Sequence, residues 1–225
     1  MTFASEPDQA PPAPGQPGGP QAAARVVLRP VAADDHAALA ALNAAEVPRL
    51  GPLSEPQLAA HVARCEVALV AEQDDGSVAG FVLALGPGAA YTSPNYRFFE
   101  ARGTPHLYVD RIAVAPQARR RGIASALSDA VEAAALARGL PEVTCEVNLR
   151  PANPGSLAFH TRRGFVPVGE QDTGALRVVL LAKRVTASGA ATASGAATAS
   201  GAATASGAAG SGPVAAEARR DEAVG

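Results

Sequence analysis

Short apolar runs alternate with segments of helical periodicity through the middle of the chain. Runs rich in β-branched and aliphatic residues predict strands at about 25–31, 67–71, 78–85, 107–114, 143–147, 165–168 and 175–182. Apolar positions three or four residues apart predict helices at about 34–45, 54–64, 122–138 and 154–163. Because Asp74-Asp75-Gly76 is a hairpin signal, the second and third strands are expected to pair antiparallel.

The order of these elements predicts an α/β fold. It reads β-α-α-β-β-β-α-β-α-β-β, and only the step from the fourth to the fifth strand requires a helical crossover of the parallel type. We therefore expect a mixed sheet with helices on both faces. Residues 86–105 contain Gly, Pro, Tyr and Phe98-Phe99 without clean periodicity, so they are expected to form a long functional loop.

The two ends of the chain differ in composition from the middle. Residues 1–24 are rich in Pro, Gly, Gln and Ala, which predicts a disordered arm. From Thr186 the hexapeptide TASGAA recurs, but it lacks the large aliphatic residues that a stacked β-helix must bury. We expect residues 186–225 to be a disordered tail and residues 25–185 to form one domain.

Charge and hydropathy exclude several functional classes. The net charge of −2 gives no general electrostatic reason to bind nucleic acid or an anionic membrane. No apolar run approaches the ~20 residues of a membrane span. The N-terminus lacks a basic n-region and an apolar h-region, so a cytoplasmic protein is expected.

Cysteine and histidine spacing predicts neither a disulfide scaffold nor a metal centre. The two cysteines, Cys65 and Cys145, are too few for a scaffold, and Cys145 is expected to be buried and inert within a strand. His36, His61 and His106 are scattered singly, so no metal is predicted.

The densest chemical signal follows the strand that ends at Val114. A turn carries three arginines, and Gly122 then opens a helix whose first turn contains the small residues Ala124 and Ser125. Free amides at a helix start, a glycine that permits close approach and adjacent cations together suit a pyrophosphate. The alternative is that the arginines are solvated surface residues before a helix.

The spacing Arg119-x-x-Gly122-x-Ala124 resembles the cofactor motif of the GNAT superfamily of N-acetyltransferases. Residues 153–165, NPGSLAFHTRRGF, are similar to the later Asn, short helix and closing Gly-Phe of that superfamily. The resemblance covers most of residues 25–184 and implies acetyl-CoA as the donor. It also implies a mostly antiparallel sheet of six to seven strands with a splayed pair of parallel central strands. Neither a P-loop nor a Gly-x-Gly-x-x-Gly motif is present.

A narrower resemblance links the chain to a poorly characterised branch of predicted acyltransferases. It rests on four segments: Asn43-x-x-Glu46-Val47-Pro48, Ser93-Pro94-Asn95-Tyr96, Tyr108-Val109-Asp110-Arg111 and Val143-Thr144-Cys145-Glu146-Val147-Asn148. This branch supplies no acceptor substrate.

The superfamily resemblance implies specific contacts with the donor. The implied cofactor-binding residues are Ile112, Ala113, Val114, Arg119, Arg120, Arg121, Gly122, Ile123, Ala124, Ser125, Asn153 and Phe159. The amide of Val114 or an immediate neighbour would polarise the thioester carbonyl. His160 stands where many relatives have a tyrosine that protonates the leaving thiolate, and an imidazolium could perform that step.

Three carboxylates are candidates for the general base that an amine acceptor of pKa ~10 requires. In order of preference they are Glu46, Asp110 and Glu146, although each could instead form an ion pair or close a loop. The expected acceptor contacts are Asn43, Glu46, Tyr96 and Glu146, with Arg97 as a further candidate.

These observations favour an N-acetyltransferase that acts on a primary amine by direct attack in a ternary complex. A small-molecule acceptor is preferred over a protein amine, and a monomer or homodimer is expected. The alternative is a catalytically inactive acyl-CoA-binding sensor or assembly module. Nucleic-acid binding through the arginines ranks last, because it needs more basic surface than one turn offers.

Overall fold

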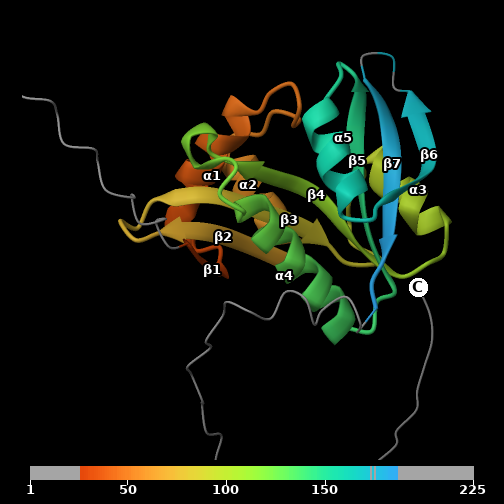
Figure 1. Cartoon of the computed structure of the whole chain (residues 1–225), viewed down its shortest axis with the longest axis horizontal. Helices are drawn as coiled ribbons and strands as arrows, with labels where there is room; N and C mark the ends of the chain where they lie inside the picture. The colour runs from red at the N-terminus through yellow and green to blue at the C-terminus, as the bar shows by residue number, and fades with distance from the viewer. Residues whose placement is uncertain (1–25, 173, 175, 187–225) are drawn as a thin grey trace, which may run out of the picture. The chain divides into compact units, whose positions relative to one another are not determined.

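A computed structural model of the chain describes residues 26–172, 174 and 176–186 (Figure 1). The strands are β1 (Val26–Pro30), β2 (Val67–Gln73), β3 (Val78–Leu85), β4 (His106–Val114), β5 (Glu142–Arg150), β6 (Val166–Asp172) and β7 (Arg177–Arg184). The α-helices are α1 (His36–Ala45), α2 (Glu55–Val62), α3 (Pro94–Ala101), α4 (Ile123–Ala137) and α5 (Pro154–Arg162). Arg25 and the predicted disordered ends lie outside the described residues, apart from Thr186.

The strands form one seven-stranded sheet in the order β1-β2-β3-β4-β5-β7-β6. The predicted antiparallel pairing of β2 with β3 is confirmed, and so is the parallel pairing of β4 with β5. The parallel register runs from His106 opposite Glu142 to Val109 opposite Cys145, and beyond it the two strands separate. The sheet is therefore mixed and mostly antiparallel, with a splayed central pair.

Alternating side chains of the sheet bury against helices on opposite faces. Val82 and Ala84 belong to the cluster that packs against α4, which crosses in front of the strands in Figure 1. Phe81 and Leu83 point the other way and pack with residues of α1 and α2, including Leu39. Successive side chains of a strand point to opposite faces of the sheet, so both faces of this sheet are covered by helices. The expected mixed sheet with helices on both faces is confirmed.

The segment 86–105 differs from its prediction as a loop, because α3 lies within it. Pro94 occupies the first turn of this helix, where a missing N–H costs nothing. Tyr96 and Phe99, three residues apart, are the two buried positions, and they pack with Tyr108. A helix this short shows only one repeat of the apolar spacing, which is why periodicity did not reveal it.

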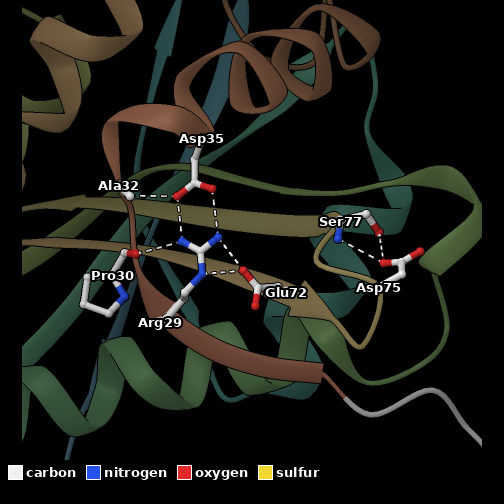
Figure 2. Close-up of polar contacts among 7 residues, drawn as sticks. All are labelled: Arg29, Pro30, Ala32, Asp35, Glu72, Asp75 and Ser77. Carbon is white, nitrogen blue, oxygen red and sulfur yellow. Dashed lines mark hydrogen bonds and ion pairs between the residues drawn. The ribbon is translucent and has the colours of Figure 1, made fainter.

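Arg29 fixes the N-terminal strand to the start of α1 (Figure 2). Its guanidinium donates to both oxygens of Asp35, at 2.7 and 2.9 Å, and to Glu72 of β2 at 2.6 Å. Asp35 also accepts from the Ala32 amide at 2.7 Å. The Arg29 hydrogen bonds hold the pKa of Asp35 below its ordinary value. These contacts set where α1 begins and hence where the segment after it lies.

No helix within the described ranges is long and apolar enough to cross a lipid bilayer.

Candidate active site

A cavity of about 710 Å³ lies where β4 and β5 separate. Seven parts of the chain contribute to its wall: the segment after α1, β4, the turn before α4, α4 itself, β5, the loop between β5 and α5, and α5. The lining residues with polar or ionisable side chains are Glu46, Arg49, Asp110, Arg119, Arg120, Ser125, Cys145, Glu146, Asn148, Asn153, Ser156, His160 and Arg162. Residues predicted from distant parts of the sequence therefore meet at one place.

A β-bulge in β4 explains why the strands separate there. Ala84 of β3 pairs with Val109, and the next residue, Leu83, pairs with Arg111, so Asp110 is the extra residue. A bulge bends its strand and redirects the side chains beyond it. Because the parallel register with β5 also ends at Val109, Asp110 lies at the opening of the fork.

The turn before α4 presents backbone amides to the cavity. Gly122, the N-cap of α4, has φ +81°, and Arg120 has φ +62°, which is unusual for a residue with a side chain. Left-handed residues next to a helix start aim successive N–H groups at one point, a geometry that binds phosphate oxygens. Arg120 and Gly122 both line the cavity, so this geometry faces it.

Eleven of the twelve predicted cofactor contacts line the cavity. They are Ile112, Ala113, Val114, Arg119, Arg120, Gly122, Ile123, Ala124, Ser125, Asn153 and Phe159. Arg121 differs, because its guanidinium donates to Gln73 at the end of β2, at 3.0 Å, and it is not among the lining residues. The side chains of Arg119 and Arg120 are thus better placed for an anion than that of Arg121.

The Val114 amide points toward the fork. Ala115 donates its N–H to the Ala79 carbonyl of the neighbouring chain segment at 2.8 Å. Along an antiparallel ladder successive N–H groups alternate in direction, so the preceding N–H points away from β3, to the side from which β5 has separated. This orientation fits the donor role predicted for Val114.

Glu146 is a half-buried carboxyl in β5 that faces the cavity. Tyr108 donates its hydroxyl to Glu146 Oε2 at 2.6 Å. Burial and the charge of Asp110 raise the pKa of Glu146 to about 7, although hydrogen bonds from Tyr108 and Asn95 act in the opposite direction. A carboxyl that titrates near neutral pH is suited to proton transfer.

Asp110 also lines the cavity, but its oxygens are already engaged. Oδ1 accepts from the Tyr91 hydroxyl at 2.8 Å, while Oδ2 lies 2.9 Å from His61 Nε2 and 3.1 Å from Arg111 Nε. Burial raises the pKa of Asp110, yet His61, Arg111 and Tyr91 outweigh it, so the net pKa lies below the ordinary value. Asp110 therefore stays ionised and is a weak base.

Glu46, the first choice for the base, is paired with two arginines. Its carboxylate contacts Arg119 from the turn before α4 and lies 3.5 Å from Arg49. Each cation competes with an incoming amine for the carboxylate oxygens. The order of preference among the three carboxylates is accordingly reversed, with Glu146 first.

His160 lines the cavity, but its surroundings disfavour the imidazolium that a proton donor needs. Only 6% of the residue is exposed, and burial lowers its pKa from the ordinary value. Nδ1 lies 2.9 Å from the Ser156 carbonyl oxygen, which can only accept, so Nδ1 carries the proton of the neutral ring. In that state Nε2 has no hydrogen to give.

Two predicted acceptor contacts are buried away from the cavity, and a third is at the surface. Asn43 is fully buried, where it accepts from Arg111 at 2.6 Å and donates to the Gly51 carbonyl at 3.1 Å. Tyr96 is 2% exposed and donates to the Gly86 carbonyl at 2.8 Å. Arg97 is exposed on α3. The segment 86–105 supplies none of the residues that line the cavity, although its Asn95 hydrogen-bonds to Glu146.

Several polar residues that support the site were missed by the sequence reasoning. Tyr108 holds Glu146, while Tyr91, His61 and Arg111 surround Asp110. The parallel pairing of β4 with β5 could have indicated Tyr108, because Tyr108 lies opposite Thr144, two residues before Glu146. The contacts of His61 and Tyr91 had no such signal, because they join segments that only the tertiary fold brings together.

Metal ligands and reactive thiols are not indicated. Within the described ranges, no group of three or more His, Cys, Asp or Glu side chains could hold a metal ion. Cys145 is buried in the core cluster as expected, and burial raises the pKa of its thiol.

A protein-family model matches the middle of the chain. The family model described as Acetyltransferase (GNAT) family matches residues 37–165, more than half of the chain. No curated protein matches the chain in sequence.

Solved structures share the fold. Ard1 from Thermoplasma volcanium superposes with a TM-score of 0.59 at 18% identity, covering 72% of this chain and 98% of its own. A GNAT superfamily phosphinothricin acetyltransferase from Sinorhizobium meliloti, solved in complex with AcCoA, has a TM-score of 0.56 at 20% identity, covering 71% and 88%. The ribosomal-protein-S18-alanine N-acetyltransferase from Escherichia coli has a TM-score of 0.54 at 17% identity, covering 72% and 95%.

Proposed function

Because the chain belongs to the acetyltransferase (GNAT) family, we propose that it transfers an acetyl group from acetyl-CoA to a primary amine of a small molecule. Attack is direct and occurs in a ternary complex. One observation carries the proposal: Glu146, whose pKa is raised to about 7, faces the same cavity as the left-handed turn at Arg120 and Gly122. A base and an anion site in one cavity suit an amine acceptor and a pyrophosphate-bearing donor.

The donor binds through backbone and side chain together. The amides at the start of α4 and the guanidinium groups of Arg119 and Arg120 hold the pyrophosphate. The pantetheine arm follows the open edge of β4 toward the fork, with Asn153 and Phe159 on the opposite wall. Asn153 also caps α5 by accepting from the Ser156 amide at 3.2 Å, so its side chain has a defined position.

Glu146 prepares the acceptor for attack. The carboxylate takes a proton from the ammonium group, and the freed nitrogen lone pair forms a bond with the thioester carbonyl carbon. The Val114 N–H donates to the carbonyl oxygen as that oxygen becomes negative. The carbon–sulfur bond then breaks, and the nitrogen releases a second proton as the amide forms.

The departing thiolate takes up one proton. The second proton that the nitrogen releases balances this uptake. Glu146 in its protonated form, with a pKa of about 7, is a stronger acid than a thiol of pKa ~8.5, so it can also deliver that proton. This shuttle makes an imidazolium at His160 unnecessary. His160 instead packs between Phe159 and Phe165, with ring centroids 5.2 and 5.1 Å away.

A small acceptor is favoured by the available volume. The cavity of about 710 Å³ must hold the pantetheine arm as well as the amine, and ligand sites of this class span roughly 300–1,000 Å³. Glu46, Arg49 and Leu50 line the cavity beside the turn that carries Arg119. Structural neighbours include enzymes named for a ribosomal-protein alanine and for phosphinothricin, so both kinds of acceptor belong in a test.

The test measures thiol release from acetyl-CoA across a panel of small amines and peptide N-termini, together with calorimetric binding of CoA. Glu146→Gln is expected to lower kcat about 10²–10⁴-fold while the Kd for CoA stays unchanged. Glu142→Gln is the matched control, because Glu142 lies in the same strand, pairs with Arg102 at 3.0 Å and does not line the cavity.

The rival function is binding without chemistry. If CoA binds tightly but no amine on the panel is acetylated, the acyl-CoA sensor replaces the enzyme. If turnover is present and Glu146→Gln retains it, the catalytic role assigned to Glu146 is wrong while the activity stands.

A further inference from the structure

Tyr108 reaches Glu146 from the neighbouring parallel strand. Tyr108 is fully buried, and its hydroxyl donates to Glu146 Oε2 at 2.6 Å. The ring packs edge-on against Tyr96, with centroids 5.5 Å apart, and at 5.7 Å from the ring of Phe99. Packing on α3 residues therefore fixes the position of the phenol, and the hydroxyl is a rigid donor.

We propose that Tyr108 is a positioning residue: it holds one oxygen of Glu146 so that the other is presented to the acceptor amine. This inference rests on the proposed function. A glutamate side chain has three rotatable bonds, and a single fixed hydrogen bond removes much of that freedom. The remaining oxygen is then the one that accepts the proton.

Asp110 acts on Glu146 in the opposite direction. The Tyr108 hydrogen bond favours the carboxylate form of Glu146, whereas the negative charge of Asp110 opposes it. Asp110 is kept ionised by His61 of α2, by Arg111 of β4 and by the Tyr91 hydroxyl. Asn95, in the first turn of α3, also favours the carboxylate form of Glu146. The pKa of Glu146 thus depends on two opposing contacts from β4: the Tyr108 hydrogen bond lowers it, and the negative charge of Asp110 raises it.

This balance predicts opposite effects for two substitutions. Tyr108→Phe keeps the ring but removes the donor, so the acidic limb of the kcat–pH profile should move up by about one pH unit. With the midpoint moved from about 7 to about 8, kcat at pH 7 falls about five-fold. Asp110→Asn removes the charge and should move the limb down. The Kd for CoA should stay the same in both variants.

Tyr96→Phe is the matched control for Tyr108→Phe. Tyr96 is an equally buried tyrosine in contact with Tyr108, but its hydroxyl bonds to the backbone of Gly86 and Ala89. We expect it to leave the pH profile in place. Thermal melting of all variants separates a loss of folding from a loss of positioning.

A second readout does not require turnover. Carbon-13 NMR of glutamate side-chain carboxyls, with the Glu146 signal identified by its loss in Glu146→Gln, follows the titration directly. An upward shift in Tyr108→Phe with none in Tyr96→Phe supports the inference, even if no amine is acetylated and the proposed function fails. An unmoved Glu146 titration in Tyr108→Phe, or an equal shift in both variants, overturns it.

Discussion

At the scale of single residues, the raised pKa of Glu146 has a consequence for stability as well as for the proposed activity. Its ordinary pKa is 4.5, and in the folded protein it is about 7. Between these two pH values the folded chain retains a proton that the unfolded chain releases. The contribution of this proton to the stability of the fold is complete below pH 4.5, and it is lost as the pH rises through about 7. Such a carboxyl is useful for catalysis and costly for folding at alkaline pH.

Glu146→Gln should therefore raise the melting temperature at pH 8 by a few degrees and change it much less at pH 5. The reason is that glutamine mimics the protonated carboxyl at every pH, so the variant avoids burying a charge. Differential scanning calorimetry at both pH values measures the effect, with about 2–4 °C expected for each kcal/mol in a chain of this size.

Glu142→Gln is the comparison for this experiment. Glu142 pairs with Arg102, so the substitution should lower the melting temperature at both pH values. An identical change for Glu146→Gln at pH 5 and pH 8 would show that Glu146 is not protonated in the folded protein near neutrality.

Residue type and spacing identified all three carboxylates of the cavity, but the contacts in the structure favour Glu146 over the other two. Glu46 and Asp110 were preferred because of their positions in the chain. Glu46 pairs with Arg119 and Asp110 with His61, and both partners come from segments far away in sequence. No local sequence pattern predicts such pairs. The same limit applies to His160, whose burial depends on the packing of α5.

At the scale of elements, the start of α4 is the feature that sequence predicted best. Small residues after Gly122, arginines before it and a preceding strand predict a helix start at this turn, and α4 begins there and lines the cavity. The bulge at Asp110 and helix α3 were not predicted, for two different reasons. A bulge is set by pairing with a partner strand, and α3 is too short to show helical periodicity.

Gly122→Ala tests whether the backbone of this turn binds the donor. Alanine at φ +81° costs about 1–2 kcal/mol, so the turn should change conformation. Its backbone N–H groups should then no longer converge on one point. We expect CoA affinity, measured by calorimetry, to fall about ten-fold or more.

Gly76→Ala provides a control with the same backbone angle. Gly76 also has φ +81° and open space around its Cα, but it lies in the turn between β2 and β3. Its replacement should lower the melting temperature by a similar amount without changing the Kd for CoA. Equal loss of affinity in both variants would mean that general destabilisation, rather than the turn, is responsible.

At the scale of the whole domain, the sheet consists of two parts that meet along the short parallel register of β4 and β5. Contacts outside the sheet reinforce this seam. Arg163, after α5, pairs with Asp129 and Glu132 of α4 at 2.5 and 2.7 Å, and Lys183 of β7 reaches Glu132 at 2.7 Å. The cavity opens along the same seam, so a donor bound there contacts both parts.

A bound donor should therefore stabilise the domain as a unit. At a concentration of one hundred times its Kd, CoA is expected to add about 2.7 kcal/mol to the free energy of unfolding, seen as one melting transition at higher temperature. Pantetheine, which lacks the pyrophosphate, should give a smaller increase at equal concentration. A melting temperature that CoA leaves unchanged would contradict a donor site at the seam.

The buried guanidinium of Arg111 has a consequence for protein engineering. It donates to the Asn43 side chain and to the Gly51 carbonyl, at 2.6 and 2.7 Å, and so anchors both ends of the stretch between them. The residues in that stretch, Glu46 and Arg49 among them, line the cavity without forming the anchor. A library that randomises residues 44–50 and keeps the two anchor points would vary substrate choice on an otherwise fixed scaffold.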